Sequence, residues 1–194
     1  MTLTNFGQDL LILPCSVVKP HPPIQRALKN TVEKLKAAGL KVVDFEPCKH
    51  DHAWEIISAL YFPDGAKCQM DIIAESGEPI LPLTQWAFDY SHGPLTVTQN
   101  WEWNVKRETY RAEYHALMRE RGVDVILCPT YVGVAPEHGT AQYWGYTGVW
   151  NILDHPAAVF PVGDFVSQEL DKAETDYKPR NTKDEREWKK CKCS

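Results

Sequence analysis

One short run of residues restricts the fold of this chain more than any other feature. Val123–Pro129 reads Val-Asp-Val-Ile-Leu-Cys-Pro and follows directly after a long helical pattern that ends at Gly122. Such a near-continuous apolar stretch is typical of a parallel strand that is buried on both faces of its sheet. A strand of this kind needs helices to cover it, so the run predicts an α/β fold.

The segments before this run repeat the order of helix, glycine and strand. Pro22 and Pro23 open an amphipathic helix that ends at Gly39, and Leu40–Phe45 follows as a short apolar strand. The same patterns predict further helices over 51–62, 66–75 and 83–88, a long helix from Thr96 or Thr98 to Gly122, and a third strand over 157–162. The loop between the last two strands, 130–148, is rich in glycine, proline and aromatic residues, and in open α/β sheets such loops carry ligand sites.

Composition narrows the class of protein further. The 194 residues make room for one domain, and a net charge of −5 offers no basic field for a nucleic acid. No apolar run near the start is long enough for a signal peptide or a membrane span. The six cysteines show no CxxC pair, which favours reduced thiols. We therefore expect a cytoplasmic protein that binds neither nucleic acid nor membrane.

Nucleotide and metal chemistry have little support in the residues. The chain has no Gly-x-Gly-x-x-Gly segment, Walker loop or Gly-x-Ser-x-Gly elbow, so we expect no cofactor. His50-Asp51-His52 is the one cluster of metal-ligand type, and two histidines one residue apart share a face only on a strand. Here Asp51 fits the N-cap of the helix that follows, so we expect no metal. A metal-dependent hydrolase built on His50 and His52 stays as a distant alternative.

Four segments, in order, carry a resemblance to a known family. They are Val17–Pro23, Tyr61-Phe62 together with Glu75–Pro79, Asp124–Pro129, and the long stretch Gln142–Gly163. Together they resemble the C-terminal part of fungal acetamidases and general amidases in the amidase signature family. The resemblance implies the amidase signature fold, an α/β/α layered sandwich with a mixed sheet, of which this chain forms the C-terminal part.

The resemblance also implies an activity, the hydrolysis of linear carboxylic amides. In the family a serine nucleophile acts with a second serine and a lysine, which removes the proton through the bridging serine. Those residues lie in a Gly/Ser-rich run of the N-terminal half, and this chain has no such run and no adjacent serine pair. We therefore expect no catalytic residue here. The family's acyl pocket lies near the Trp-Gly-Tyr-Thr segment, which makes Trp144, Tyr146, Thr147 and Asn151 the predicted lining of a substrate pocket.

The boundaries of the resemblance divide the chain into three parts. Residues 1–16 are an atypical N-terminal junction, 17–166 form the amidase-like portion, and 167–194 form a tail in which more than half of the residues are charged. We expect this tail to be solvated and disordered, or to dock through its few apolar residues. The expected protein is a truncated amidase that binds a small amide, is inactive alone, and self-associates through exposed strand edges. The alternatives are a non-catalytic descendant that binds a partner or a small molecule, and a decayed gene product.

Overall fold

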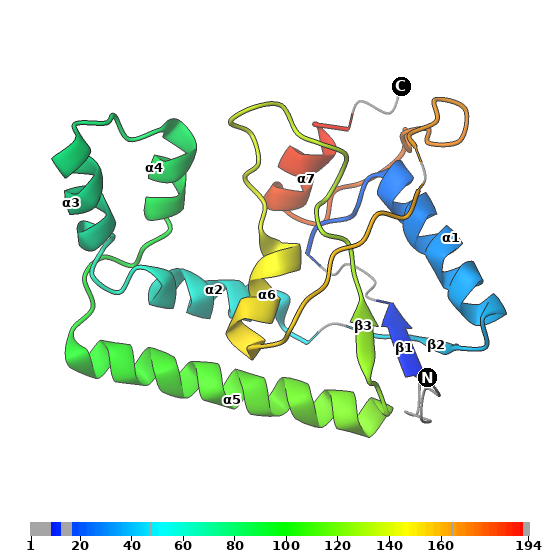
Figure 1. Ribbon diagram of the computed structural model, residues 1–194, viewed down its shortest axis with the longest axis horizontal. Coiled ribbons are helices and arrows are strands. Elements are labelled where there is room, and N and C mark those ends of the chain that lie inside the picture. The colour runs from blue at the N-terminus through cyan, green and yellow to red at the C-terminus, as the bar shows by residue number, and fades with distance from the viewer. Residues whose placement is uncertain (1–8, 13–16, 47, 164, 192–194) are drawn as a thin grey trace.

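Three strands and seven helices make up the described part of the chain (Figure 1). The computed structural model describes residues 9–12, 17–46, 48–163 and 165–191. The strands are β1 (Asp9–Ile12), β2 (Lys41–Asp44) and β3 (Val125–Leu127). The helices are α1 (Pro22–Ala37), α2 (His50–Tyr61), α3 (Lys67–Ser76), α4 (Pro82–Phe88), α5 (Val97–Arg121), α6 (Gly145–Leu153) and α7 (Thr182–Trp188). No helix of this described part is long and apolar enough to cross a membrane.

The three strands form one parallel sheet in the order β2-β1-β3. Leu11 of β1 pairs with Val43 on one side and with Ile126 on the other. The central strand therefore comes from the segment expected to be an atypical junction, while residues 1–8 and 13–16 of that segment lie outside the described residues. Both predicted helix-to-strand units are confirmed, because α1 leads through Gly39 into β2 and α5 leads through Gly122 into β3.

Every pairing among the described strands is parallel. Two expectations for individual strands need correction. The segment 157–162 forms no described strand, and it runs along the surface with Val159 79% exposed. β3 was expected to be buried on both faces, but it lies at the edge of the described sheet with Val125 57% exposed. Apolar sequence marks a strand that is suited to burial, yet burial itself depends on the neighbours that the strand meets.

Local signals explain where the helices begin and end. Thr96 closes a capping box with Gln99 at the start of α5, which decides between the two predicted N-caps. Gly122 ends α5 in the left-handed conformation that glycine adopts without strain. For α2 the predicted N-cap was wrong: Lys49 holds that position, and Asp51 lies inside the first turn, where its charge favours the helix dipole.

The main core lies between α2, α5 and α6, with α2 packed against both of the other helices. Ile56 of α2, Tyr114 of α5 and Leu153 of α6 are each at most 1% exposed. The β2 and β3 strands add Val43 and Ile126 to the edge of this cluster. The hydroxyl of Tyr110 in α5 donates to the Cys48 carbonyl at 2.9 Å, which ties the loop before α2 to the same core.

The charged C-terminal segment docks on the rest of the chain, so the disordered alternative was wrong for residues 165–191. Asp171 accepts two hydrogen bonds from Arg26 of α1, at 2.7 and 2.9 Å. Docking involves an apolar residue, as predicted, because Trp188 lies edge-to-face with His21 at 5.9 Å between ring centroids. Charged residues also take part, since Asp184 and Glu187 of α7 are 0% and 1% exposed. Buried carboxylates are stable only when paired, and here their partners come from the N-terminal part of the chain and from the tail itself.

Candidate functional site

A cleft lies beyond the carboxyl ends of the three parallel strands. Val17 follows β1, His50 follows β2, and residues 142–145 come from the long connection after β3. Because the strands are parallel, the segments that leave their carboxyl ends meet at one edge of the sheet, where open α/β folds place their ligands. The cleft has an empty volume of about 400 Å³, part of it open to solvent. We call it the aromatic cleft.

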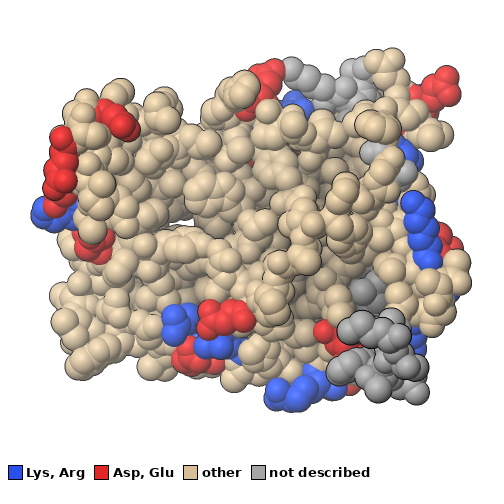
Figure 2. Space-filling model, viewed as in Figure 1, with Lys and Arg blue, Asp and Glu red and all other residues tan. Residues whose placement is uncertain are grey.

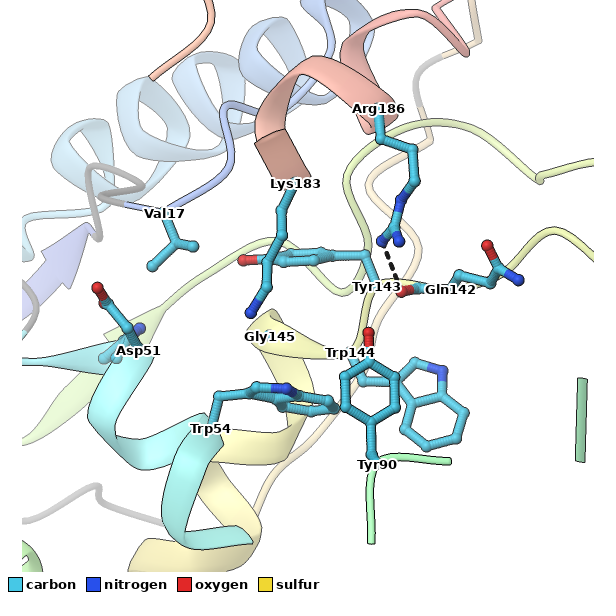
Figure 3. Close-up of a pocket in the computed structure, with 11 residues that line it drawn as sticks. Val17, Asp51, Trp54, Tyr90, Gln142, Tyr143, Trp144, Gly145, Lys183 and Arg186 are labelled. Atoms are coloured by element: carbon cyan, nitrogen blue, oxygen red, sulfur yellow. Dashed lines mark hydrogen bonds between the residues drawn. The ribbon is translucent and has the colours of Figure 1, made fainter. Parts of the chain in front are cut away.

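Aromatic side chains form one wall of the aromatic cleft (Figure 3). Trp54 of α2 and Tyr90, which follows α4, have their ring centroids 5.3 Å apart, nearly perpendicular. The ring centroid of Trp144, which is the N-cap residue of α6, lies 6.5 Å from the ring centroid of Trp54. Behind it, Trp86 of α4 contacts Trp144 edge-to-face with 4.9 Å between centroids. Edge-to-face geometry is the favourable arrangement for such rings, so the wall is preorganised by its own contacts.

Charged groups from α7 and α2 complete the lining of the cleft. Lys183 and Arg186 reach in from α7, and Asp51 lies in the first turn of α2 (Figure 3). Arg186 donates to the Gln142 carbonyl at 3.0 Å and pairs at 2.9 Å with Glu187, a carboxylate that it shares with Lys190. These contacts hold the cleft loop to α7. The amino nitrogen of Lys183 lies 6.0 Å from the centre of the Trp54 ring.

His50 contributes a neutral imidazole to the lining. Burial lowers its pKa from 6.5 to about 4, because a charged ring would lose its hydration there. Its Nε2 shares a hydrogen bond with the Tyr114 hydroxyl at 3.2 Å, and its ring stacks on Tyr114. His52 points elsewhere on α2, toward Glu55 at 3.1 Å. Among the described residues no group of three or more histidine, cysteine, aspartate or glutamate side chains could hold a metal ion.

The four residues predicted to line a pocket lie in or beside α6, in different surroundings. Trp144 lines the aromatic cleft. Tyr146 is 6% exposed, and its hydroxyl donates to the Val18 carbonyl, so it joins α6 to the segment after β1. Thr147 is exposed and donates to the Trp144 carbonyl at 3.2 Å. Asn151 is exposed and donates to the Tyr61 hydroxyl. Contact of any of the four with a substrate stays a prediction.

The sequence prediction missed most of the cleft. Trp54 lies in the helix predicted over 51–62 but was not predicted to line a site, and neither were the tail residues Lys183 and Arg186. The signal that could have found α7 is Asn181, whose side chain accepts from the Asp184 amide at 2.9 Å as an N-cap. Asn-Thr-Lys-Asp-Glu is a helix start with two acids in its first turn, and a helix within a tail indicates a docked element.

The described serines take part in local structure. Ser58 donates to two carbonyls of its own helix, and Ser91 donates to the Phe62 carbonyl at 3.1 Å. Ser76 donates to Ile73, while Ser167 accepts from Leu170. In the described part of the chain, no serine makes a hydrogen bond with a lysine or a histidine.

Comparison with known proteins assigns the chain to a family. The family model named Amidase matches residues 12–177. A Schizosaccharomyces pombe protein named as an amidase is 41% identical over 171 residues. The match covers 87% of this chain and 32% of that protein. An acetamidase of Emericella nidulans is 32% identical and is matched over 83% of this chain and 30% of its own length. The chain thus spans about a third of the length of these relatives.

A solved structure agrees with the sequence matches. A fatty acid amide hydrolase is 36% identical, with a TM-score of 0.90 over 96% of this chain and 34% of that chain. This match confirms the predicted α/β architecture of the amidase signature fold. With the family model covering most of its residues, the chain belongs to the Amidase family.

Proposed function

We propose that this chain forms the substrate-binding wall of an amide hydrolase, and that the acyl part of a small linear amide packs in the aromatic cleft. The observation that carries the proposal is the position of Trp144. It lies in the segment that resembles the amidases and also belongs to the aromatic wall. Flat apolar rings bind apolar acyl groups, and the polar groups opposite would orient the amide.

We further propose that the 194-residue chain does not hydrolyse amides alone. Hydrolysis by the family's chemistry needs a serine whose proton is removed by a neighbouring base. The hydrogen bonds of the described serines lead to backbone groups instead. Acetamide, butyramide and phenylacetamide should therefore release no ammonia above the buffer rate. Release that disappears when one of the six serines is replaced by alanine would refute this proposal.

Amide binding can be measured even when no bond is cleaved. Titration of the chain with butyramide and phenylacetamide, followed by NMR line broadening of the amide, tests the aromatic cleft directly. Trp144→Ala should weaken phenylacetamide binding about three- to tenfold, as expected when contact with an aromatic ring is lost. Trp101→Ala is the matched control, since Trp101 of α5 is 67% exposed and is not part of the cleft lining. Equal affinities in both variants would remove Trp144 from the binding site.

A non-catalytic protein that binds a small molecule is the second candidate. Lys183, whose ammonium faces the aromatic wall, favours it, because a cation at this place can bind a charged ligand. In this case charged ligands would bind in the cleft and linear amides would not bind. We also propose a cytoplasmic location, supported by the free thiols of the four described cysteines.

Self-association of the chain is a further part of the proposal. Apolar side chains along 159–166 are exposed, among them Phe160 at 55% and Phe165 at 87%. In Figure 2 charged residues lie mainly around the rim of this face, and few occupy its middle. Exposed apolar surface favours contact between two copies, and so does the outer edge of β3, which pairs with no other described strand. Sedimentation should show a dimer or larger species that Phe160→Glu converts to monomer, and a wild-type monomer would contradict the proposal.

A further inference from the structure

Lys183 is a cation of α7 whose recorded partner is an aromatic ring, in a cation–π contact, and not a carboxylate. It lies in the first turn of α7, where the helix dipole disfavours positive charge. No described carboxylate lies within ion-pair distance of it, whereas Lys189 and Lys190 of the same helix both pair with glutamates. Its ammonium instead lies 6.0 Å from the centre of the Trp54 ring, inside the aromatic cleft (Figure 3).

The backbone that carries Lys183 is held firmly on both sides. Asn181 caps the helix by accepting from the Asp184 amide at 2.9 Å. Asp184, which follows Lys183 in the chain, is fully buried and accepts a hydrogen bond from the Lys19 amide at 2.8 Å. These contacts place the start of α7 against the mouth of the cleft. They direct the Lys183 side chain into the cleft, and none of them depends on the charge of Lys183.

Among the described residues that line the cleft, Lys183 is the cation without an ion-pair partner. Arg186 shares the buried Glu187 with Lys190, at 2.9 and 3.0 Å, and also donates to the Gln142 carbonyl, so its guanidinium is held in place. His50 is neutral because burial lowers its pKa to about 4. Asp51 is an exposed carboxylate on α2 with a structural reason for its position, because it lies in the first turn of that helix. An anion that enters the cleft would be attracted by Lys183 and repelled by Asp51.

We propose that the aromatic cleft binds a small aromatic carboxylate, with its carboxyl group on the Lys183 ammonium and its ring against Trp54 and Trp144. The two recognition elements lie together: Lys183 lies over Trp54, and the ring of Trp54 meets that of Trp144 at 6.5 Å. This inference rests on the proposed function in that it uses the same cleft. It adds that the cleft prefers the acid to the matching amide, so an acid formed by amide hydrolysis would be retained there.

The first test compares three probes of one shape on the full chain: phenylacetate, phenylacetamide and phenethylamine. Calorimetric or NMR titration at low salt should give phenylacetate about fivefold tighter binding than phenylacetamide, the size expected for one partly exposed ion pair. Phenethylamine should bind more weakly than either. Half-molar salt should remove most of the preference for the acid, because exposed charge pairs are screened.

Substitutions test whether the preference for phenylacetate over phenylacetamide depends on the ammonium group of Lys183. Lys183→Met keeps the length of the side chain and should make phenylacetate bind no better than phenylacetamide. Lys189→Met is the matched control from the same helix, where the lysine pairs with Glu185 at 2.6 Å, and it should leave the preference intact. Asp51→Asn should strengthen phenylacetate binding. Lys183→Gln provides a second neutral variant, and circular dichroism checks that each variant is folded.

The outcomes separate this inference from the proposed function. If phenylacetamide binds at the cleft while phenylacetate binds no tighter, or if Lys183→Met keeps the preference for the acid, the carboxylate site is refuted and the amide cleft stands. If phenylacetate and phenylacetamide both fail to bind, both proposals fall. If phenethylamine binds most tightly and Asp51→Asn abolishes its binding, the cleft recognises a cation, and the inference is wrong.

Discussion

Replacing Asp184 with alanine tests whether the C-terminal segment is an integral part of this fold. The side chain is 0% exposed and accepts hydrogen bonds from the Lys19 amide at 2.8 Å, the Arg180 amide at 2.9 Å and the Tyr177 hydroxyl. Asp184→Ala leaves these three donors without their acceptor. A buried donor that loses its partner costs about 1–3 kcal/mol.

The expected loss follows from how far water can replace the carboxylate. All three hydrogen bonds are partly buried, but Arg180 is an exposed residue whereas Lys19 and Tyr177 are half-buried. We therefore expect water to satisfy the Arg180 amide more readily than the other two donors. Two buried donors left without an acceptor should lower the free energy of unfolding by about 2–4 kcal/mol. Asp184→Asn should lower the free energy of unfolding by about half as much. Its carbonyl oxygen can still accept from one side, whereas its NH₂ group cannot accept from the donors on the other side.

Urea unfolding followed by circular dichroism measures the free energy, and limited trypsin digestion reports whether 165–191 has detached. Glu185→Ala is the matched control, since Glu185 lies next in the same helix and pairs with Lys189 on the surface, where such pairs contribute about 0–1 kcal/mol. If Asp184→Ala unfolds within 0.5 kcal/mol of the wild type, a value below the smallest stranded-donor cost of about 1 kcal/mol, the reasoning is refuted. Unchanged protection of the tail from trypsin would refute it independently.

Two other predictions follow from close contacts and burial. Gly133→Ala would place a Cβ atom 2.4 Å from Nδ1 of the buried His21 ring, so it should lower stability by about 1–3 kcal/mol in urea unfolding. Gly148→Ala meets only ordinary contacts beginning at 3.5 Å and should not destabilise α6. The pKa of His50 is lowered from 6.5 to about 4, so the unfolded chain binds more protons between these values and stability should fall as pH falls from 6.5 to 4. His50→Gln should remove about 3 kcal/mol of this dependence, and an identical pH profile would contradict the assignment.

Helices were the part of the fold that the sequence predicted best. Their boundaries depend on local signals, such as Thr96 with Gln99 at the start of α5 and Gly122 at its end. The strands were less predictable, because 157–162 has the composition of a buried strand but lies exposed. Its apolar residues favour burial. Whether they form a paired strand depends on a neighbouring strand, which no local sequence pattern specifies.

The candidate site was predicted only in part, for the same physical reason. Trp144 could be named because it lies in a segment that resembles the amidases. Its partners in the aromatic cleft come from α2 and from α7, and only the parallel sheet and the docked tail bring them together. Charged residues such as Asp184 and Glu187 are rarely fully buried, so their composition indicated solvent exposure. Their hydrogen-bond partners are distant in sequence and cannot be read from a local pattern.

Binding and bond cleavage place different demands on this chain. The aromatic cleft depends on contacts among described residues: edge-to-face rings, the link from Arg186 to the Gln142 carbonyl, and the buried Asp184 that positions α7. None of these contacts involves a described serine, so the shape of the cleft does not depend on a nucleophile. Ligand affinity measured on this chain therefore reports the wall alone. If Asp184→Ala weakens phenylacetate binding more than phenylacetamide binding, the position of α7 serves the charge of Lys183, and the docked tail is part of the binding site.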